Sequence, residues 1–204
     1  MTRLTLVRHG QTDTNQQGLF TGRTDVPLNE RGLKQVKCLH ERLAPERFDR
    51  VLASDLKRTR TTAEAIVSGR GLAVEYTPYL REINFGQMEG LSVHNLAGKS
   101  IDFDWWVDGN FAKSPPGGES MNDVVARANV VLDMLKEPEG AKHILVVSHG
   151  AVLRVLFCLM LGMEPKYLRR FRLDVASVSV IEMLRHGAAL ALLNDTHHLD
   201  GLAG

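Results

Sequence analysis

The sequence predicts an α/β fold: a three-layer sandwich with a mostly parallel central sheet, helices on both faces, and a short lid-like insertion. Two observations lead to this expectation. Strand and helix patterns alternate through the first half of the chain, and a second buried strand runs into an apolar helix further on. With 204 residues, the chain fits a single domain over residues 1–204, in which residues 91–118 form the insertion.

The chain begins with a short apolar strand over residues 5–7, which ends at Arg8-His9-Gly10. A loop rich in glycine, threonine and asparagine follows. Asn29 is a favourable N-cap, and leucine and valine then recur at helical spacing until Pro45. This pattern predicts a helix between Asn29 and Pro45.

A second strand and a second helix come next. Residues 48–53 form the apolar run of the strand, which ends in Ser54-Asp55, and a helix opens at about Leu56. Residues 73–76 then form a short third strand. The order strand, helix, strand, helix, strand implies parallel pairing.

The periodic pattern weakens over residues 91–118, which contain the aromatic side chains Phe103, Trp105, Trp106 and Phe111. A Pro/Gly turn closes this stretch. We expect it to lie over the functional site as an insertion.

The last third of the chain repeats the pattern of the first residues, in which a buried strand ends in a histidine and a glycine. Ser120 and Asp123 resemble a capping box at the start of an amphipathic helix. A buried strand over residues 143–147 ends in Ser148-His149-Gly150 and is followed by an apolar helix over 151–161. Each strand therefore delivers a histidine, followed by a glycine, to the same edge of the sheet.

The C-terminal region reads as an antiparallel hairpin over residues 177–184 and 188–193 that completes the sheet. The tail after Asn194 is expected at the surface. Its adjacent His197 and His198 are typical of solvated side chains, and the sequence offers no other convincing metal-ligand spacing.

Composition excludes several classes of function. The formal net charge of +1 gives no global field for nucleic acid or an anionic membrane. The apolar helix at 151–161 is interrupted by Arg154 and is too short for a membrane span. Cys38 and Cys158 lie in apolar stretches and are expected to be reduced thiols of a cytoplasmic protein.

Each candidate residue also has a structural interpretation when it is taken alone. A histidine at a strand end is often a hydrogen-bonded turn residue, as for His9 and His149, and Arg58 or Glu82 could be solvated. Their coincidence at one edge of the sheet, together with Arg8, favours a functional site.

The spaced motifs resemble the histidine phosphatase superfamily, in its phosphoglycerate mutase-like branch, over nearly the whole chain. The matching stretches are Leu-Val-Arg8-His9-Gly10 with Thr12 and Asn15; Thr21-Gly22; Ala53-Ser54-Asp55 with Arg58; Glu82 with Phe85-Gly86 and Glu89-Gly90; Gly118-Glu119-Ser120; and Ser148-His149-Gly150.

The resemblance implies a catalytic role for five residues and a phosphate-binding role for four. His9 would attack phosphorus and form a phosphohistidine, Glu82 would act as the acid and base, and the remaining catalytic side chains, Arg8, Arg58 and His149, would donate hydrogen bonds to the phosphoryl group. Asn15, Thr21, Gly22 and the backbone N–H of Gly150 would contact phosphate. The scheme requires no cofactor and no metal, and its partner would be a small phosphorylated metabolite.

The insertion and one departure from the family pattern favour a phosphatase over a mutase. Mutases of this branch carry a longer insertion rich in basic residues, whereas residues 91–118 offer Lys99 and Lys113 beside a histidine. Mutases also place arginine directly after the catalytic glutamate, where Ile83 stands here. A phosphatase releases phosphate to water.

The aromatic insertion is similar to that of alpha-ribazole phosphatases of cobalamin biosynthesis. Trp105 or Trp106 could stack on a benzimidazole nucleoside, or both could pack within the insertion. A broad-specificity sugar-phosphate or nucleotide phosphatase, a phosphoglycerate mutase, and a non-catalytic phosphoprotein-binding module remain the alternatives. The non-catalytic alternative predicts the loss of at least one of the five catalytic residues, and all five are present. The sequence leaves the oligomeric state open, a homodimer included.

Overall fold

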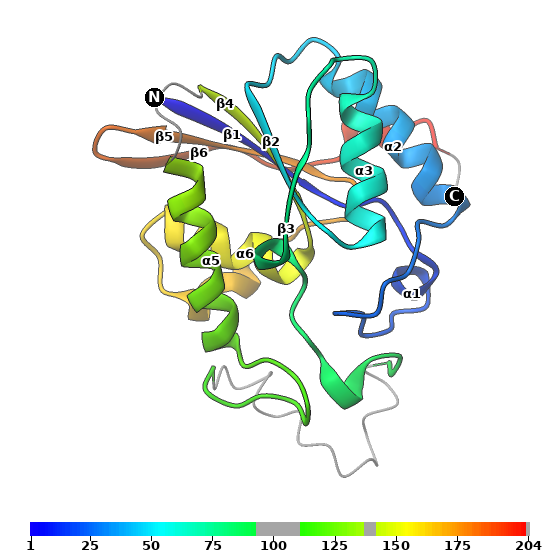
Figure 1. Cartoon of the computed structure of the whole chain (residues 1–204), viewed down its shortest axis with the longest axis vertical. Coiled ribbons are helices and arrows are strands. Elements are labelled where there is room, and N and C mark those ends of the chain that lie inside the picture. Colours follow the sequence, from blue (N-terminus) through cyan, green and yellow to red (C-terminus); the bar gives the residue numbers. More distant parts are fainter. Residues whose placement is uncertain (93–110, 137–141, 203–204) are drawn as a thin grey trace.

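The computed structural model describes residues 1–92, 111–136 and 142–202. A six-stranded sheet with the order β3-β2-β4-β1-β5-β6 forms its centre, and helices lie on both faces (Figure 1). The expected three-layer α/β architecture is confirmed. The strands are β1 (Thr2–Arg8), β2 (Arg50–Ser54), β3 (Glu75–Thr77), β4 (His143–Ser148), β5 (Val178–Leu184) and β6 (Gly187–Asp195).

The sheet is parallel on one side and antiparallel on the other. Strands β1, β4, β2 and β3 pair in parallel, while β5 is antiparallel to β1 and β6 is antiparallel to β5. In the pairing of β1 with β4, Arg8 stands opposite Ser148. His9 and His149 therefore leave the sheet side by side, and the His9 N–H donates to the Ser148 carbonyl over 3.0 Å.

Two pairs of helices bury the two faces of the sheet (Figure 1). Helices α2 (Glu30–Leu43) and α3 (Lys57–Val67) cover one face, where Val7 of β1 joins their core. Helices α5 (Met121–Lys136) and α6 (Gly150–Met160) cover the other, where Leu6 of β1 points. Neighbouring residues of one strand thus pack into hydrophobic cores on opposite faces of the sheet, because side chains alternate across a sheet.

The predicted helix starts are present. The Asn29 side chain accepts the Gly32 N–H over 2.8 Å at the beginning of α2. Before α5, Ser120 Oγ accepts the Asp123 N–H over 3.1 Å, and Asp123 accepts the Ser120 N–H over 2.9 Å. These contacts satisfy backbone donors that the first turn of a helix leaves unpaired.

Several features lie outside the sequence prediction. The predicted loop after Gly10 contains the short helix α1 (Asp13–Gln16), capped by Thr12. Short 3-10 helices also occur between the main elements. They are η1 (Pro78–Leu80), η2 (Gly86–Met88), η4 (Pro165–Arg170) and η5 (His197–Leu199). Residues 93–110, which include Trp105 and Trp106, fall outside the described part of the chain.

The tail is less exposed than expected. His198 is half-buried, because η5 packs against helix α2. Both cysteines are free thiols: Cys158 is buried and Cys38 is half-buried. Within the described residues, no helix combines the length and apolarity that crossing a membrane requires.

Candidate active site

The carboxyl end of β1 presents His9 as a buried, neutral imidazole. The side chain is 3% exposed, and its Nδ1 lies 2.7 Å from the carbonyl oxygen of Gly10. A carbonyl can only accept, so Nδ1 carries the ring proton and Nε2 keeps its lone pair. Nε2 is therefore the nucleophilic nitrogen of this ring.

The carboxyl end of β4 places His149 against the first histidine. The two ring centroids are 5.0 Å apart, with the planes at 62°. Nδ1 of His149 accepts the Nε–H of Arg58 over 3.2 Å, which leaves the proton on Nε2, and Nε2 donates to Ser54 Oγ over 2.9 Å. Both nitrogens of His149 are thus engaged, and this ring is also neutral.

Burial and positive charge keep both histidines unprotonated. Burial first, and then the charges of Arg58 and Arg8, hold the pKa of His9 well below its usual value, against the opposing hydrogen bond to Gly10. Burial and Arg58 do the same for the pKa of His149. A neutral nucleophile is consequently available at neutral pH.

Arg58 reaches this point from the first turn of α3 and is 1% exposed. Its Nη2 donates to the Gly22 carbonyl over 2.8 Å, and its Nη1 donates to the Thr24 carbonyl over 2.9 Å. A guanidinium has five N–H groups. The three contacts to Gly22, Thr24 and His149 use one each, so two N–H groups remain for a ligand.

Arg8, which is partly buried, brings a second cation to the same edge. Nη1 donates to the Leu173 carbonyl over 2.7 Å, whereas the buried Nε atom has no hydrogen-bond partner among the residues that the structure describes. The guanidinium packs on Gly150, where an added Cβ would lie 3.5 Å from Cζ of Arg8. An unpaired cationic donor in a buried position is costly, and a bound anion would satisfy it.

Glu82 lies at the amino end of α6. Both carboxylate oxygens lie 3.2 Å from the N–H of Ala151, and the side chain is 9% exposed. Helix α6 has no cap from the side chain at its own N-cap position, so Glu82 takes that role.

The site thus combines two arginines, two neutral histidines and one carboxylate at the edge of the sheet where β1 and β4 end. The model of the histidine phosphatase superfamily (branch 1) matches residues 4–196. The chain belongs to this superfamily. The resemblance seen in the sequence motifs is confirmed.

Individual relatives agree with the family match. Phosphoserine phosphatase 1 of Hydrogenobacter thermophilus is 34% identical over 200 residues, covering 98% of this chain and 95% of the relative. Adenosylcobalamin/alpha-ribazole phosphatase of Escherichia coli is 34% identical over 193 residues, covering 94% and 95%. The crystal structure of the alpha-ribazole phosphatase from Shigella flexneri matches with a TM-score of 0.89 at 33% identity, over 95% of this chain and 96% of that one.

In this histidine phosphatase, a partly buried ion pair between Arg127 and Glu119 supports the segment that carries Glu82. Arg127 of α5 donates to Glu119 over 3.2 Å and to the Tyr79 carbonyl over 2.7 Å, and it also donates to the Arg81 carbonyl. Glu119 in turn accepts the Asn84 N–H over 2.8 Å. Sequence patterns did not reveal this support, although Glu119 lies in the quoted Gly-Glu-Ser motif.

The remaining phosphate-binding candidates are placed less directly. Gly22 contacts Arg58 through its carbonyl, and Gly150 lies against Arg8. Asn15 Oδ1 accepts the Thr12 N–H over 3.1 Å in the cap of α1, and Thr21 Oγ1 donates to the Leu19 carbonyl over 3.4 Å. Phosphate contact by these residues stays a prediction, as does donation to phosphate by His149.

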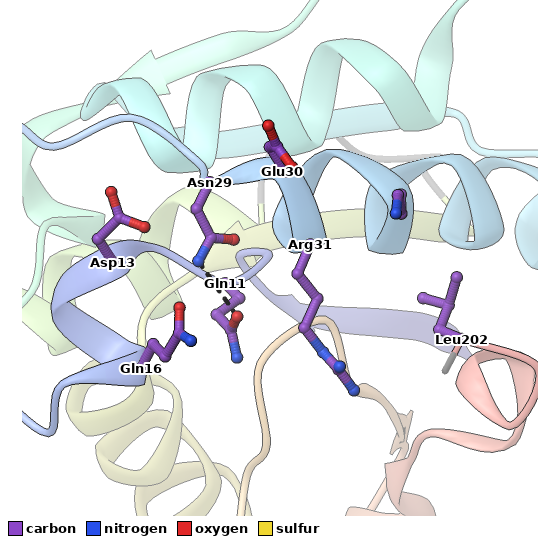
Figure 2. Close-up of a pocket in the computed structure, with 8 residues that line it drawn as sticks. Gln11, Asp13, Gln16, Asn29, Glu30, Arg31 and Leu202 are labelled. Carbon is purple, nitrogen blue, oxygen red and sulfur yellow. Dashed lines mark hydrogen bonds between the residues drawn. The ribbon is translucent and has the colours of Figure 1, made fainter. Parts of the chain in front are cut away.

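A surface pocket of about 380 Å³ lies beside α1 and the start of α2 (Figure 2). Gln11, Asp13 and Asn29 are among the residues that line it, and none of the five catalytic candidates does. Figure 2 shows the Gln11 and Asn29 side chains joined by a hydrogen bond, in which Asn29 Nδ2 donates to Gln11 Oε1 over 3.2 Å. Among the described residues, no group of three histidine, cysteine or acidic side chains could hold a metal ion.

Proposed function

We propose that this chain is a metal-independent phosphomonoesterase that acts through a phosphohistidine at His9. One observation carries the proposal: Nε2 of a neutral His9 keeps its lone pair under the electrostatic influence of Arg58 and Arg8, whose guanidiniums have N–H groups without a partner among the described residues. Such fixed donors suit the three oxygens of a transferring phosphoryl group.

In the first step, Nε2 of His9 forms a bond to phosphorus while the bond from phosphorus to the ester oxygen breaks. The protonated carboxyl of Glu82 gives its proton to the departing oxygen, and an alcohol leaves. Arg8 and Arg58 hold the phosphoryl oxygens throughout. In the substrate-free site His149 orients Arg58, because its Nδ1 accepts from that guanidinium.

In the second step, water attacks the phosphohistidine. The Glu82 carboxylate takes a proton from this water, the bond between Nε2 and phosphorus breaks, and inorganic phosphate leaves. His9 regains its neutral form and Glu82 its proton. The cycle is balanced and needs no other reactant.

The substrate that we propose is alpha-ribazole 5'-phosphate, the chemistry named for the relatives from Escherichia coli and Shigella flexneri. The chain would act as one domain, in which residues 91–118 select the leaving alcohol. We place the enzyme in the cytoplasm, because free thiols such as Cys38 and Cys158 suit a reducing compartment.

Hydrolysis of a small aryl phosphate in the presence of a chelator tests the reaction class. We expect turnover by the purified chain and at least a 10²-fold loss in His9→Ala. Full activity of His9→Ala would refute the phosphohistidine. A chain that binds phosphate but never hydrolyses an ester would instead be a phosphate-binding module.

A substrate panel tests the specific assignment. Alpha-ribazole 5'-phosphate, phosphoserine, phosphoglycerate, sugar phosphates and mononucleotides are compared by kcat/KM. We expect alpha-ribazole 5'-phosphate to be preferred by about tenfold or more, which is about 1.4 kcal/mol of differential transition-state binding. A smaller preference leaves the reaction class intact and removes the assignment of substrate.

A further inference from the structure

Glu89 is a carboxylate outside the five catalytic positions, and it gathers three hydrogen-bond donors from one loop. It follows η2 and is half-buried. Oε1 accepts the Arg23 N–H over 2.6 Å. Oε2 accepts the Thr24 N–H over 2.7 Å and also the Thr24 hydroxyl. Hydrogen bonds to an ionised carboxylate are the stronger kind.

The same loop holds Arg58 from its other side. The Gly22 carbonyl and the Arg23 N–H belong to one peptide unit: the carbonyl accepts from Nη2 of Arg58 over 2.8 Å, and the N–H donates to Glu89 over 2.6 Å. A peptide unit is planar and stiff. Any displacement of the N–H by Glu89 therefore moves the oxygen on which the guanidinium rests.

The peptide unit between Gly22 and Arg23 is tightly packed. A Cβ added to Gly22 would lie 2.0 Å from the Ile83 carbonyl oxygen and 2.8 Å from Oε1 of Glu89. The far end of the loop is also fixed, because Asp25 accepts the Lys57 N–H over 2.7 Å at the start of α3. The loop therefore holds Glu89 and Arg58 in a fixed position relative to each other.

We propose that Glu89 is a positioning residue, which sets the orientation of the Arg58 guanidinium toward the transferring phosphoryl group through the Gly22–Arg23 peptide. This inference rests on the proposed function of the site. The carboxylate also polarises the shared peptide, which strengthens the contact of its carbonyl with Arg58. Burial lowers the pKa of Arg58, and the negative charges of Glu82, Asp25 and Glu89 oppose that effect.

Glu89→Gln is the central variant. It keeps the shape of the side chain but replaces one accepting carboxylate oxygen with an NH2 donor, which faces a backbone N–H group instead of accepting from it. We expect kcat for an aryl phosphate to fall by about 10- to 100-fold, with KM changed far less. Glu64→Gln, at a glutamate of α3 that accepts the Tyr76 hydroxyl, is the matched control and keeps wild-type kcat.

A double-mutant cycle shows whether Glu89 acts through Arg58. Adding Glu89→Gln to Arg58→Ala should change kcat by less than about twofold, because the guanidinium that Glu89 positions is then missing. Equal losses in both backgrounds would overturn the proposal. So would wild-type kcat in a folded Glu89→Gln protein.

Two further measurements keep the proposal separate from folding and from the proposed function. Thr24→Ala removes only the hydroxyl donor to Glu89, and we expect a smaller fall in kcat that again vanishes in Arg58→Ala. Calorimetric binding of tungstate, a tetrahedral oxyanion, reports on Arg58 without turnover. If the wild type hydrolyses no ester, the proposed function fails, and Glu89 is then judged by whether Glu89→Gln weakens tungstate binding only while Arg58 is present.

Discussion

Nδ1 of His149 accepts the Nε–H of Arg58 over 3.2 Å, and this contact depends on a serine behind the ring. Arg58 sets the tautomer, because its Nε–H can only donate, and Ser54 Oγ then accepts the hydrogen bond from Nε2–H over 2.9 Å and holds the ring in place. The orientation of Arg58 is thereby linked to a hydroxyl at the end of β2.

We expect Ser54→Ala to lower kcat by about tenfold, because His149 can then change tautomer or rotate away from Arg58. The buried Nε2–H also loses its acceptor, which costs about 1–3 kcal/mol of unfolding free energy. Ser179→Ala is the matched control: Ser179 is buried on β5 and accepts the Asn194 N–H over 2.9 Å. Both variants should unfold more easily in urea, and only Ser54→Ala should lose turnover.

Arg58→Lys should be nearly as damaging as removal of the side chain. A lysine ammonium cannot reproduce the planar fork that contacts Gly22, Thr24 and His149 and still faces the phosphoryl group. We expect kcat/KM to fall by about 10²-fold or more in steady-state assays. Arg60→Lys, two residues along α3 at an exposed arginine stacked 4.0 Å over Tyr76, should retain turnover. Equal effects of the two changes would contradict this role of the Arg58 fork.

Arg127→Met should destabilise the fold by about 1–3 kcal/mol, because it leaves the carbonyls of Tyr79 and Arg81 without their buried donor, whereas Glu119 keeps its ion pair with Arg23 over 2.8 Å. Urea unfolding measures the loss. Lys136→Met, which breaks an exposed pair with Asp133, should change stability by less than about 1 kcal/mol. If Arg127→Met folds as stably as the wild type, the ion pair is not the support of the Glu82 segment.

The free energy of unfolding should fall as the pH drops below about 6.5. His9 and His149 have lowered pKa values in the folded chain, so the unfolded chain binds their protons first. Each histidine then contributes a slope of up to about 1.4 kcal/mol per pH unit, and this loss is absent above pH 7.

His9→Gln isolates one of these contributions. Its unfolding free energy, measured in urea at several pH values between 7.5 and 5, should vary less steeply than that of the wild type by up to about 1.4 kcal/mol per unit. His143 and His198 also have lowered pKa values, but they are common to both proteins and cancel in the difference. Identical slopes would show that His9 is protonated in the folded chain.

The fold could be predicted because its signals are local. Asn29, Pro45 and the Ser120-Asp123 pair mark helix boundaries that the structure reproduces. The position of the two histidines at one edge of the sheet could be predicted too. Each histidine directly follows a buried strand, and these two strands, β1 and β4, pair in parallel. Helix α1 was missed, although Thr12 and Asn15 carry a cap-like spacing that could have indicated it.

The supporting contacts of the site could not be predicted in the same way. Arg127 meets the Arg81 carbonyl 46 positions away, and Glu89 meets Thr24 across 65 positions. In these two contacts the partner atom belongs to the backbone, which every residue type shares. No periodicity or spacing in a single sequence indicates such contacts.

The adjacency of β1 and β4 has a consequence for how such enzymes diversify. Neighbouring strands of a sheet are held about 4.8 Å apart by the backbone alone, whatever side chains surround them. The distance between His9 and His149 is therefore set by the hydrogen-bonded pairing of β1 with β4, and not by the loops that surround the site. Peripheral segments can be exchanged between relatives to change the accepted alcohol, while the reaction centre needs no redesign.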